Sequence, residues 1–226
     1  MKVYLIKSDF DLAWVNCSEA GMNMKLDRMF NDKALSNLDG PVRLEIGGIG
    51  SKGDFVLADN VYLSGFGPLL LSEHAITLLG ELLSDVGYFV DTVLISDMSY
   101  KLFICERQID ALDQNKSELK RFNDGMVSKI SRHELNAEIV RDMHAFRLKH
   151  RRSCMFVSDH FVSMVKKHEL TGFVFEEIWS SETGGVQLPP VMPPIERVRG
   201  EFAKRAKAKR KAFREILARR TIDTTA

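Results

Sequence analysis

The sequence predicts an α+β fold, in which two strand-helix-strand units pack on a mixed or antiparallel sheet and a long basic helix follows at the C-terminus. A repeated segment is the first observation, because residues 69–90 (LLLSEHAITLLGELLSDVGYFV) and 154–175 (CMFVSDHFVSMVKKHELTGFVF) share one pattern. In each copy an apolar run leads into a Ser-acid-His triplet, a helix of roughly three turns, a glycine and another apolar run. The second observation is an abrupt change to proline and then to lysine and arginine after Trp179.

The Ser-acid-His triplets are interpreted as helix starts. Ser72 and Ser158 suit the N-cap position, because a serine hydroxyl accepts a hydrogen bond from a first-turn N–H group. The acid that follows each serine faces the positive end of the helix dipole. A catalytic triad is the alternative, but adjacent residues on one helical turn point in different directions. Gly87 and Gly172 are expected to release the chain into the following strands.

Composition and cysteine use indicate a globular protein that stays in the cytoplasm. The 226 residues are 45% hydrophobic and 28% charged, which is enough apolar material for a sizeable core. The sequence shows neither a signal-peptide pattern at its start nor an apolar run of membrane-spanning length. Cys17, Cys105 and Cys154 are an odd number at wide spacing, which favours reduced thiols over disulfides.

Motifs for catalysis, metal or nucleotide binding are incomplete. The glycine-rich residues 47–53 (GGIGSKG) lack P-loop spacing, so hairpin turns are favoured over phosphate binding. His133 and Glu134 begin an H-E-x-x-H pattern, but Ala137 stands where the second zinc ligand would be. We therefore expect no cofactor, no metal and no enzymatic activity. An enzyme of unrecognised type, built around His144, His150 and His160, is kept as an alternative.

The composition divides the chain into four expected parts. Residues 1–66 form a β-rich part, in which the first strand (MKVYLI) is expected at a sheet edge or half-buried. Residues 67–183 hold the two related units, and residues 184–194 form a proline-rich extended linker. Residues 195–220 are expected to form a helix with a sparse apolar stripe.

The C-terminal segment is strongly basic, whereas the rest of the chain is acidic. Residues 195–226 carry 11 Lys and Arg against 4 Asp and Glu, and the remainder carries 21 against 27. Docking on the acidic body or on a partner is favoured, and pairing with a second copy in a homodimer stays open. Nucleic-acid binding is the alternative, with contacts expected from Arg205, Lys209, Arg210 and Arg214. A membrane-surface helix would need a larger apolar face.

The order of several segments resembles a family of bacterial immunity proteins that are encoded beside polymorphic toxins. The segments are Gly53-Asp54-Phe55, LLLSEHAITLLGELL, YKLFICERQIDALD, HAFRLKH and FVSDHFVSMVKKHELTGFVFEEIW. The clearest positions are Phe146, Leu148, Val157, Ser158 and residues 170–176. The resemblance covers roughly residues 50–180 and marks a fold more than a chemical signature.

The resemblance implies a protein that binds a cognate toxin, encoded nearby, and blocks it in the cytosol. It brings no catalytic residues. An inhibitor of this kind presents an interface of roughly 1,600 Å² centred on aromatic or arginine anchors. Glu176, Glu177 and Trp179, at the end of the last strand of the second unit, are the candidate partner-binding residues. The ordinary alternative is that they finish a sheet edge.

Overall fold

The computed structural model describes residues 1–9, 12–31, 38, 40–47, 57–64, 69–94, 99–188 and 198–223, and it has the expected α+β class. The helices are α1 (Met22–Asn31), α2 (Glu73–Leu83), α3 (Ala137–Val140), α4 (Asp159–Lys167) and α5 (Val198–Asp223). The first strands are β1 (Lys2–Ser8), β2 (Trp14–Cys17), β3 (Val42–Gly47), β4 (Asn60–Leu63), β5 (Leu69–Ser72), β6 (Gly87–Leu94) and β7 (Tyr100–Cys105). The later strands are β8 (Gln108–Ile109), β9 (Glu118–Arg121), β10 (Val127–Arg132), β11 (Ala145–Leu148), β12 (Arg151–Ser158), β13 (Phe173–Ser180) and β14 (Gly184–Gly185).

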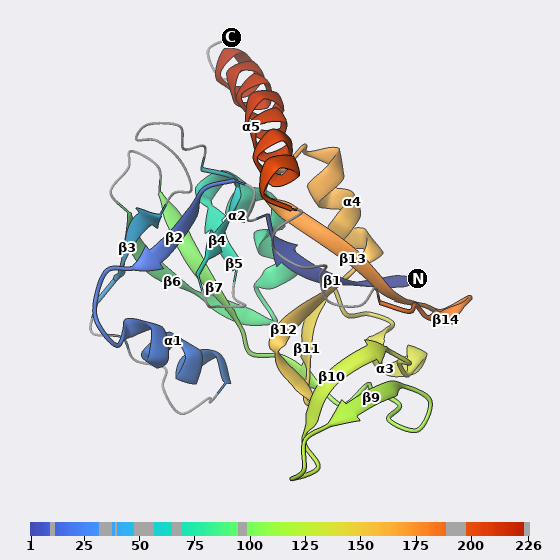
Figure 1. Ribbon diagram of the computed structural model, residues 1–226. Helices are drawn as coiled ribbons and strands as arrows, with labels where there is room; N and C mark the ends of the chain where they lie inside the picture. Colours follow the sequence, from blue (N-terminus) through green and yellow to red (C-terminus); the bar gives the residue numbers. More distant parts are fainter. Residues whose placement is uncertain are drawn as a thin grey trace.

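The described strands form a closed barrel, an open sheet and a hairpin. The barrel has the strand order β2-β3-β6-β7-β5-β4, and the open sheet has the order β14-β13-β1-β12-β11-β8. β9 and β10 form a two-stranded sheet, and Arg132 at the end of β10 also forms an isolated bridge with Gln187. Figure 1 shows α2 beside the barrel strands, α4 beside β13 of the open sheet, and α5 standing out from the body at the C-terminal end.

β1 lies in the middle of the open sheet, so the expectation of an edge strand is wrong. It pairs antiparallel with β12 on one side and with β13 on the other. Val3, Leu5 and Ile6 are buried, because both faces of the sheet are covered at this strand. The short alternating pattern is compatible with a strand that is buried on one face. The residues that bury its other face are far away in the sequence, so the pattern does not indicate them.

The two strand-helix-strand units are confirmed. The first consists of β5, α2 and β6, and the second of β12, α4 and β13. The outer strands of each unit run parallel, because each is antiparallel to a strand inserted between them. That inserted strand is β7 in the first unit and β1 in the second. The units therefore share an arrangement but obtain their middle strand from opposite directions along the chain.

Both serines cap their helices as expected. The Ala75 N–H donates to Ser72 Oγ at 3.1 Å, and the Phe161 N–H donates to Ser158 Oγ at 3.3 Å. Glu73 and Asp159 occupy the first turns of α2 and α4, where a negative charge complements the helix dipole. The helix-start interpretation thus holds in both copies.

Gly87 and Gly172 precede strands at matched positions, and each is required for a different reason. Gly172 has φ +80°, in the left-handed region that favours glycine. At Gly87 the constraint is space, because an added Cβ would lie 2.1 Å from the carbonyl oxygen of Ile104. A side chain at either position would force the backbone to move.

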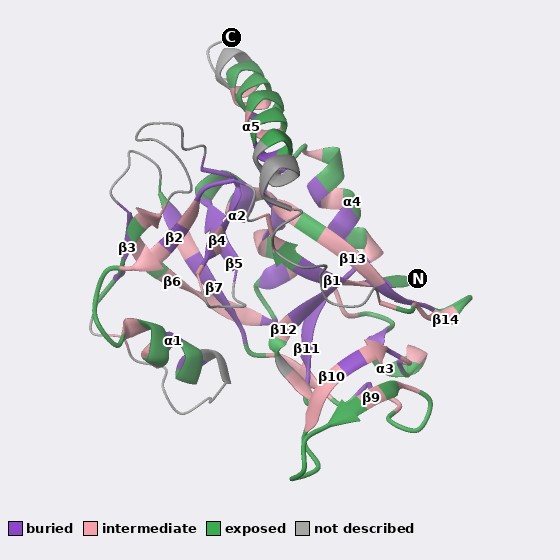
Figure 2. Cartoon of the chain, in the orientation of Figure 1, coloured by how far each residue is buried: buried purple, intermediate pink, exposed green. Residues whose placement is uncertain are grey.

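The main core lies between the barrel and the open sheet and is closed by α2 and α4. Helix residues at helical spacing enter it, including Ala75, Leu79 and Leu83 of α2 and Phe161, Val162 and Val165 of α4. A second cluster fills the barrel, and a third lies on the other face of the open sheet under the β9–β10 hairpin. Figure 2 shows this burial in β5, β7, β11 and β12, whereas most of α5 is exposed.

His133 is buried beside the third core. Its side chain is 1% exposed and its ring packs edge-on against Phe156, with the centroids 5.7 Å apart. Among the described residues, neither ring nitrogen has a hydrogen-bond partner. Burial, with a smaller effect of the Arg151 charge, lowers the pKa of His133 from 6.5 to about 4. The folded protein therefore holds this imidazole neutral, and an H-E-x-x-H zinc role for it has no geometric basis.

The buried imidazole makes folding stability depend on pH. Between pH 6.5 and 4 the unfolded chain binds a proton at His133 that the folded chain does not, so stability falls as the pH falls. The expected loss is about 2 kcal/mol at pH 5 and about 3 kcal/mol at pH 4 relative to pH 7.5. Urea unfolding across this range should show a flatter pH profile for His133→Phe, whereas His74→Phe, at an exposed helical position, should parallel the parent. Parallel profiles for all three proteins would contradict the assignment.

Strand pairing crosses the expected boundary at residue 66. β2 and β3, which precede it, share the barrel with β5, β6 and β7, which follow it. Gly184 and Gly185 form β14 against the end of β13, and the Leu188 N–H donates to the Ser131 carbonyl at 2.8 Å. The four prolines of the expected linker and most of the glycine-rich residues 47–53 lie outside the described residues.

Candidate functional site

The sequence-predicted partner residues of β13 are brought to one strand but not to one surface. Register with β1 places Glu177 opposite Tyr4 and Glu176 opposite Leu5. Neighbouring side chains of a strand point to opposite faces, so the two carboxylates face away from each other. Each has a lysine partner, since Lys2 Nζ lies 2.7 Å from Glu177 Oε2 and Lys7 Nζ lies 2.6 Å from Glu176 Oε2.

Trp179 is a core residue. Its side chain is 4% exposed and belongs to the third core, next to Val3 and Ile178. The register shift between Val3 and Tyr4 leaves Ile178 opposite no β1 residue, which turns both Ile178 and Trp179 inward. Trp179 therefore has no exposed ring to offer a partner while this core is intact. The exposed part of the predicted surface is limited to the two partly exposed glutamates.

The basic helix α5 docks on the body of its own chain. Its inner face carries Ala206 and Phe213, which are buried, and Leu217, which is half-buried. Phe213 forms a small apolar cluster with Leu12 and Ala58. The spacing of seven and four residues places this stripe on one side of the helix. A homodimer through the same stripe would have to displace these intramolecular contacts.

Ion pairs extend the same docking face. Lys209 Nζ lies 2.6 Å from Asp9 Oδ2, and Arg220 Nη1 lies 3.1 Å from both carboxylate oxygens of Asp59. Asp59 is 5% exposed, so its charge is compensated inside the protein. Sequence reasoning missed this pair, because the two residues are 161 positions apart and neither lies in a motif.

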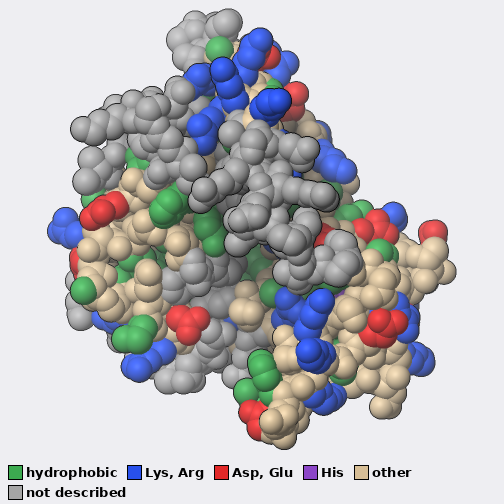
Figure 3. Space-filling model, viewed as in Figure 1, with side chains coloured by type: hydrophobic (Ala, Val, Ile, Leu, Met, Phe, Trp, Pro, Cys, Tyr) green, Lys and Arg blue, Asp and Glu red, His purple; other side chains and the backbone are tan. Residues whose placement is uncertain are grey.

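The residues predicted to contact nucleic acid divide between the two sides of α5. Lys209 takes part in docking and Arg210 is half-buried, whereas Arg205 and Arg214 are exposed. The outer side also carries exposed Lys204, Lys207 and Lys211, and Figure 3 shows a group of Lys and Arg side chains on this helix. Among the described residues, no helix has the length and apolarity needed to cross a membrane.

Two of the three histidines of the alternative enzyme hypothesis lie together. The rings of His144 and His160 are 5.1 Å apart, and His144 Nδ1 lies 3.3 Å from Ser158 Oγ. His150 is elsewhere, next to Gln114 and Asp110. Ser158 is 6% exposed and its oxygen already accepts the first-turn N–H of α4. Within the described ranges, no cluster of three or more His, Cys, Asp and Glu side chains could hold a metal ion.

The neighbouring acid of the second triplet is also engaged in structure. Asp159 Oδ2 accepts the backbone N–H of Lys2 at 3.0 Å, which ties the start of α4 to the first residues of β1. In the first triplet Ser72 Oγ donates to Asp59 Oδ1 at 3.1 Å, and His74 points to solvent. The two triplets therefore serve as helix starts, and a converging Ser, acid and His set does not form at either.

The three cysteines lie apart from one another in the fold, and Cys105 is the buried one. All three are free. Cys105 is buried in the main core, and this burial raises the pKa of its thiol to about 11. Partial burial likewise raises the pKa of Cys17 to about 11. Both thiols are therefore protonated near neutral pH, which makes them poor nucleophiles.

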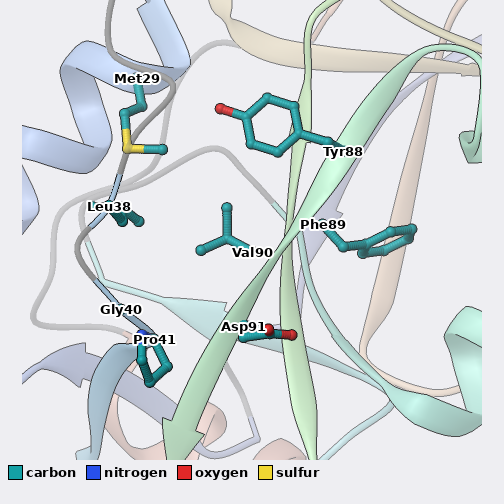
Figure 4. Close-up of a pocket in the computed structure, with 8 residues that line it drawn as sticks. All are labelled: Met29, Leu38, Gly40, Pro41, Tyr88, Phe89, Val90 and Asp91. Carbon is teal, nitrogen blue, oxygen red and sulfur yellow. The ribbon is translucent and has the colours of Figure 1, made fainter.

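A shallow pocket of about 330 Å³ lies between α1 and β6. Its lining consists of Met29, Leu38, Gly40, Pro41, Tyr88, Phe89, Val90 and Asp91. Figure 4 shows Tyr88 and Val90 pointing toward Met29 and Leu38, whereas Phe89 points away. Its carboxylate, Asp91, is ion-paired with Lys101 at 2.8 Å. Of its lining side chains only those of Tyr88 and Asp91 carry polar groups, which is less than the converging set of a typical small-molecule site.

One family model matches residues 37–180, which is more than half of the chain, and the family is described as "Immunity protein family (Imm11)". No curated protein matches the chain. The matched segment runs from before β3 to the end of β13, so it contains both strand-helix-strand units and the β9–β10 hairpin.

Proposed function

The chain belongs to the immunity protein family (Imm11), and from this premise we propose that it protects its own cell by binding and neutralising a cognate toxin domain in the cytosol. The observation that carries the proposal is the family match over residues 37–180, which contains both strand-helix-strand units and the β9–β10 hairpin. The toxin is expected to be encoded near this protein and to act inside the cell, as a nuclease or a nucleotide-modifying enzyme would.

We propose neutralisation by binding and not by chemical destruction of the toxin. The side chains that most suggested chemistry have structural tasks, which supports this mechanism. Ser72 and Ser158 cap helices, His133 is buried in the neutral form, and Cys105 is a protonated core thiol. A stable inhibitor of this kind needs a preformed surface with a few well-placed anchors.

The second candidate function is nucleic-acid binding by the outer side of α5. Docking engages Lys209 and Arg220, but Lys204, Lys207 and Lys211 remain exposed along one helix. Phosphate neutralisation requires only such clustered cations, and affinity would fall steeply with salt. The net negative charge of the remaining chain opposes the approach of a polyanion, which places this function second.

Co-expression with the toxin tests the proposal. Cells that induce the toxin encoded by the neighbouring gene should lose viability, and this chain should restore their colony counts. The two purified proteins should also elute as one complex in size-exclusion chromatography. Because the protein is proposed to neutralise the toxin by binding to it, protection should require at least one molecule of this protein for each molecule of toxin.

The variant Lys207→Glu with Lys211→Glu separates the two candidate functions. It reverses two exposed charges of α5 outside the family-matched segment, so it should protect as well as the parent protein. If this variant loses protection and the parent binds duplex DNA with strong salt dependence, the nucleic-acid function is favoured. A parent chain that neither protects nor forms a complex would sink the immunity proposal.

A further inference from the structure

The β9–β10 hairpin has two faces of opposite character. Leu119, Val127 and Ile130 point toward the third core, where they cover the open sheet. Strand register places Lys129 opposite Lys120. The Phe122 N–H donates a hydrogen bond to the Met126 carbonyl at 2.8 Å, so Phe122 and Met126 form a pair on either side of the turn. Because side chains alternate along β9, Lys120 and Phe122 share the face turned away from the core. We call Lys120, Phe122, Met126 and Lys129 the hairpin face.

The apolar part of the hairpin face is exposed at its tip. Phe122 is 58% exposed and Met126 is 63% exposed, although both are large hydrophobic side chains. Aromatic residues and methionine are enriched at the centres of protein interfaces. Figure 1 shows the hairpin projecting from the lower edge of the body, and Figure 3 shows hydrophobic side chains near its tip, beside Lys and Arg. The tip can therefore enter a recess in a partner without a change of the core.

The charged part of the hairpin face is unfavourable for the isolated protein. Lys120 and Lys129 lie directly opposite each other, and like charges in such a cross-strand pair are destabilising. Among the described residues, neither lysine forms an ion pair. The next pair on the same face, Glu118 and Arg132, is complementary at 3.3 Å. The lysine pair thus leaves two cations available for an anionic partner, next to the apolar tip.

The turn that presents this face is held by hydrogen bonds. Arg121 Nη1 donates to the Gly125 carbonyl at 2.8 Å, and Arg121 Nη2 donates to Gln114 Oε1 at 2.7 Å. Gly125 has φ +84°, a conformation that glycine adopts without strain. Asp124 Oδ1 accepts the N–H of Met126 at 2.9 Å. The loop is thereby preorganised, which reduces the entropy lost when it binds.

We propose that the hairpin face is the surface that receives the toxin, and that the toxin offers it an apolar recess bordered by Asp and Glu side chains. This inference rests on the proposed function and names its binding surface. The state of the charged groups favours the hairpin face over the predicted surface on β13. Glu176 and Glu177 already form ion pairs with lysines of β1. Lys120 and Lys129 have no acidic partner among the described residues. The hairpin also lies inside the family-matched segment, unlike α5.

Affinity for the toxin tests the inference. The probe is the purified toxin domain from the neighbouring gene, made inactive by substitution of its own catalytic residue, with the full-length chain immobilised for surface plasmon resonance. Phe122→Ser with Met126→Ser should raise Kd by about 100-fold or more, because two interface anchors are removed. Lys120→Glu with Lys129→Glu should lower the association rate constant by about 10-fold at low salt, since attraction becomes repulsion.

Two control variants match these changes elsewhere. Met24→Ser removes a methionine that is 66% exposed on α1, and Lys207→Glu with Lys211→Glu reverses the same number of charges on α5. Both should bind with the parent Kd. All variants should keep a melting temperature close to that of the parent, because the substituted side chains are exposed apart from Lys129, which is half-buried.

The outcomes are distinguishable. Parent-like binding by both hairpin variants overturns this inference and leaves the proposed function in place, whereas a parent chain that does not bind the toxin removes both. Light scattering that shows a parent dimer, converted to monomer by Phe122→Ser with Met126→Ser, would assign the face to a second copy. Duplex DNA binding that Lys120→Glu with Lys129→Glu abolishes would assign it to nucleic acid. Either assignment overturns the inference.

Discussion

A chain that lacks residues 1–9 is expected not to fold. β1 is hydrogen-bonded on both sides in the open sheet, so its removal leaves β12 and β13 without a common neighbour. It also removes Val3, Leu5 and Ile6, which are buried and worth roughly 1.5–3 kcal/mol each. Their sum, with the lost strand pairing, approaches the whole stability of a typical domain, about 5–15 kcal/mol.

Circular dichroism and urea unfolding provide the measurement. The shortened chain should show no cooperative unfolding transition, and a synthetic peptide of residues 1–9 added in excess should restore one. A matched deletion of residues 198–226 removes α5, which contributes only a small apolar cluster and a few ion pairs. That deletion should give a folded but less stable protein. A cooperative transition in the chain without residues 1–9, of parent amplitude, would contradict the role of β1.

The same reasoning applies to the family-matched segment. Residues 37–180 include both units but not β1, although β1 is the inserted strand of the second unit. The corresponding strand of the first unit, β7, lies inside the segment. The segment also lacks β2 of the barrel, so it is expected to be insufficient as an isolated fragment, and the peptide of residues 1–9 alone should not restore a cooperative transition.

The local part of the fold was predictable from the sequence. The two Ser-acid-His triplets, the helices after them and the glycines before the next strands all depend on signals within about 20 residues. The central position of β1 was not predictable, because its neighbours β12 and β13 lie more than 150 residues away. Alternation of apolar residues indicates which face of a strand is buried, but it does not identify the strand that pairs with it. The same holds for the barrel, which joins strands from both sides of residue 66.

The exposure of side chains at the candidate site was also not predictable from the local sequence. Trp179 was expected at the surface, and a one-residue bulge in β13 turns it into the core, which no residue type near it signals. From the sequence alone, the segment of the hairpin indicates only a polar connection followed by a strand or turn. Its turn, Asn123-Asp124-Gly125, carries a usable signal for a tight loop, but the exposure of Phe122 and Met126 depends on what covers the other face.

Asp59 is expected to be the most costly single polar side chain to remove. Its Oδ2 accepts hydrogen bonds from the N–H of Thr171 at 2.8 Å and from Thr171 Oγ1 at 2.5 Å. Its Oδ1 accepts one from Ser72 Oγ at 3.1 Å, and Arg220 contacts both oxygens. One buried carboxylate thus joins the cap of α2, the turn before β13 and the docked helix α5. Substitution would leave several buried donors without an acceptor.

Asp59→Ala should lower the free energy of unfolding by about 3–5 kcal/mol, the usual effect of breaking a buried charged network on one side. Arg220→Ala should lower it by only about 1–2 kcal/mol, because a quarter of the Arg220 side chain is exposed and Asp59 keeps its other three hydrogen bonds. In urea titrations the double variant should be little worse than Asp59→Ala, since the second substitution then removes a partner that is already lost. Strict additivity of the two effects would show that Asp59 and Arg220 do not act together. A cost below about 1 kcal/mol for Asp59→Ala would show that this carboxylate does not hold α2, the turn before β13 and α5 together.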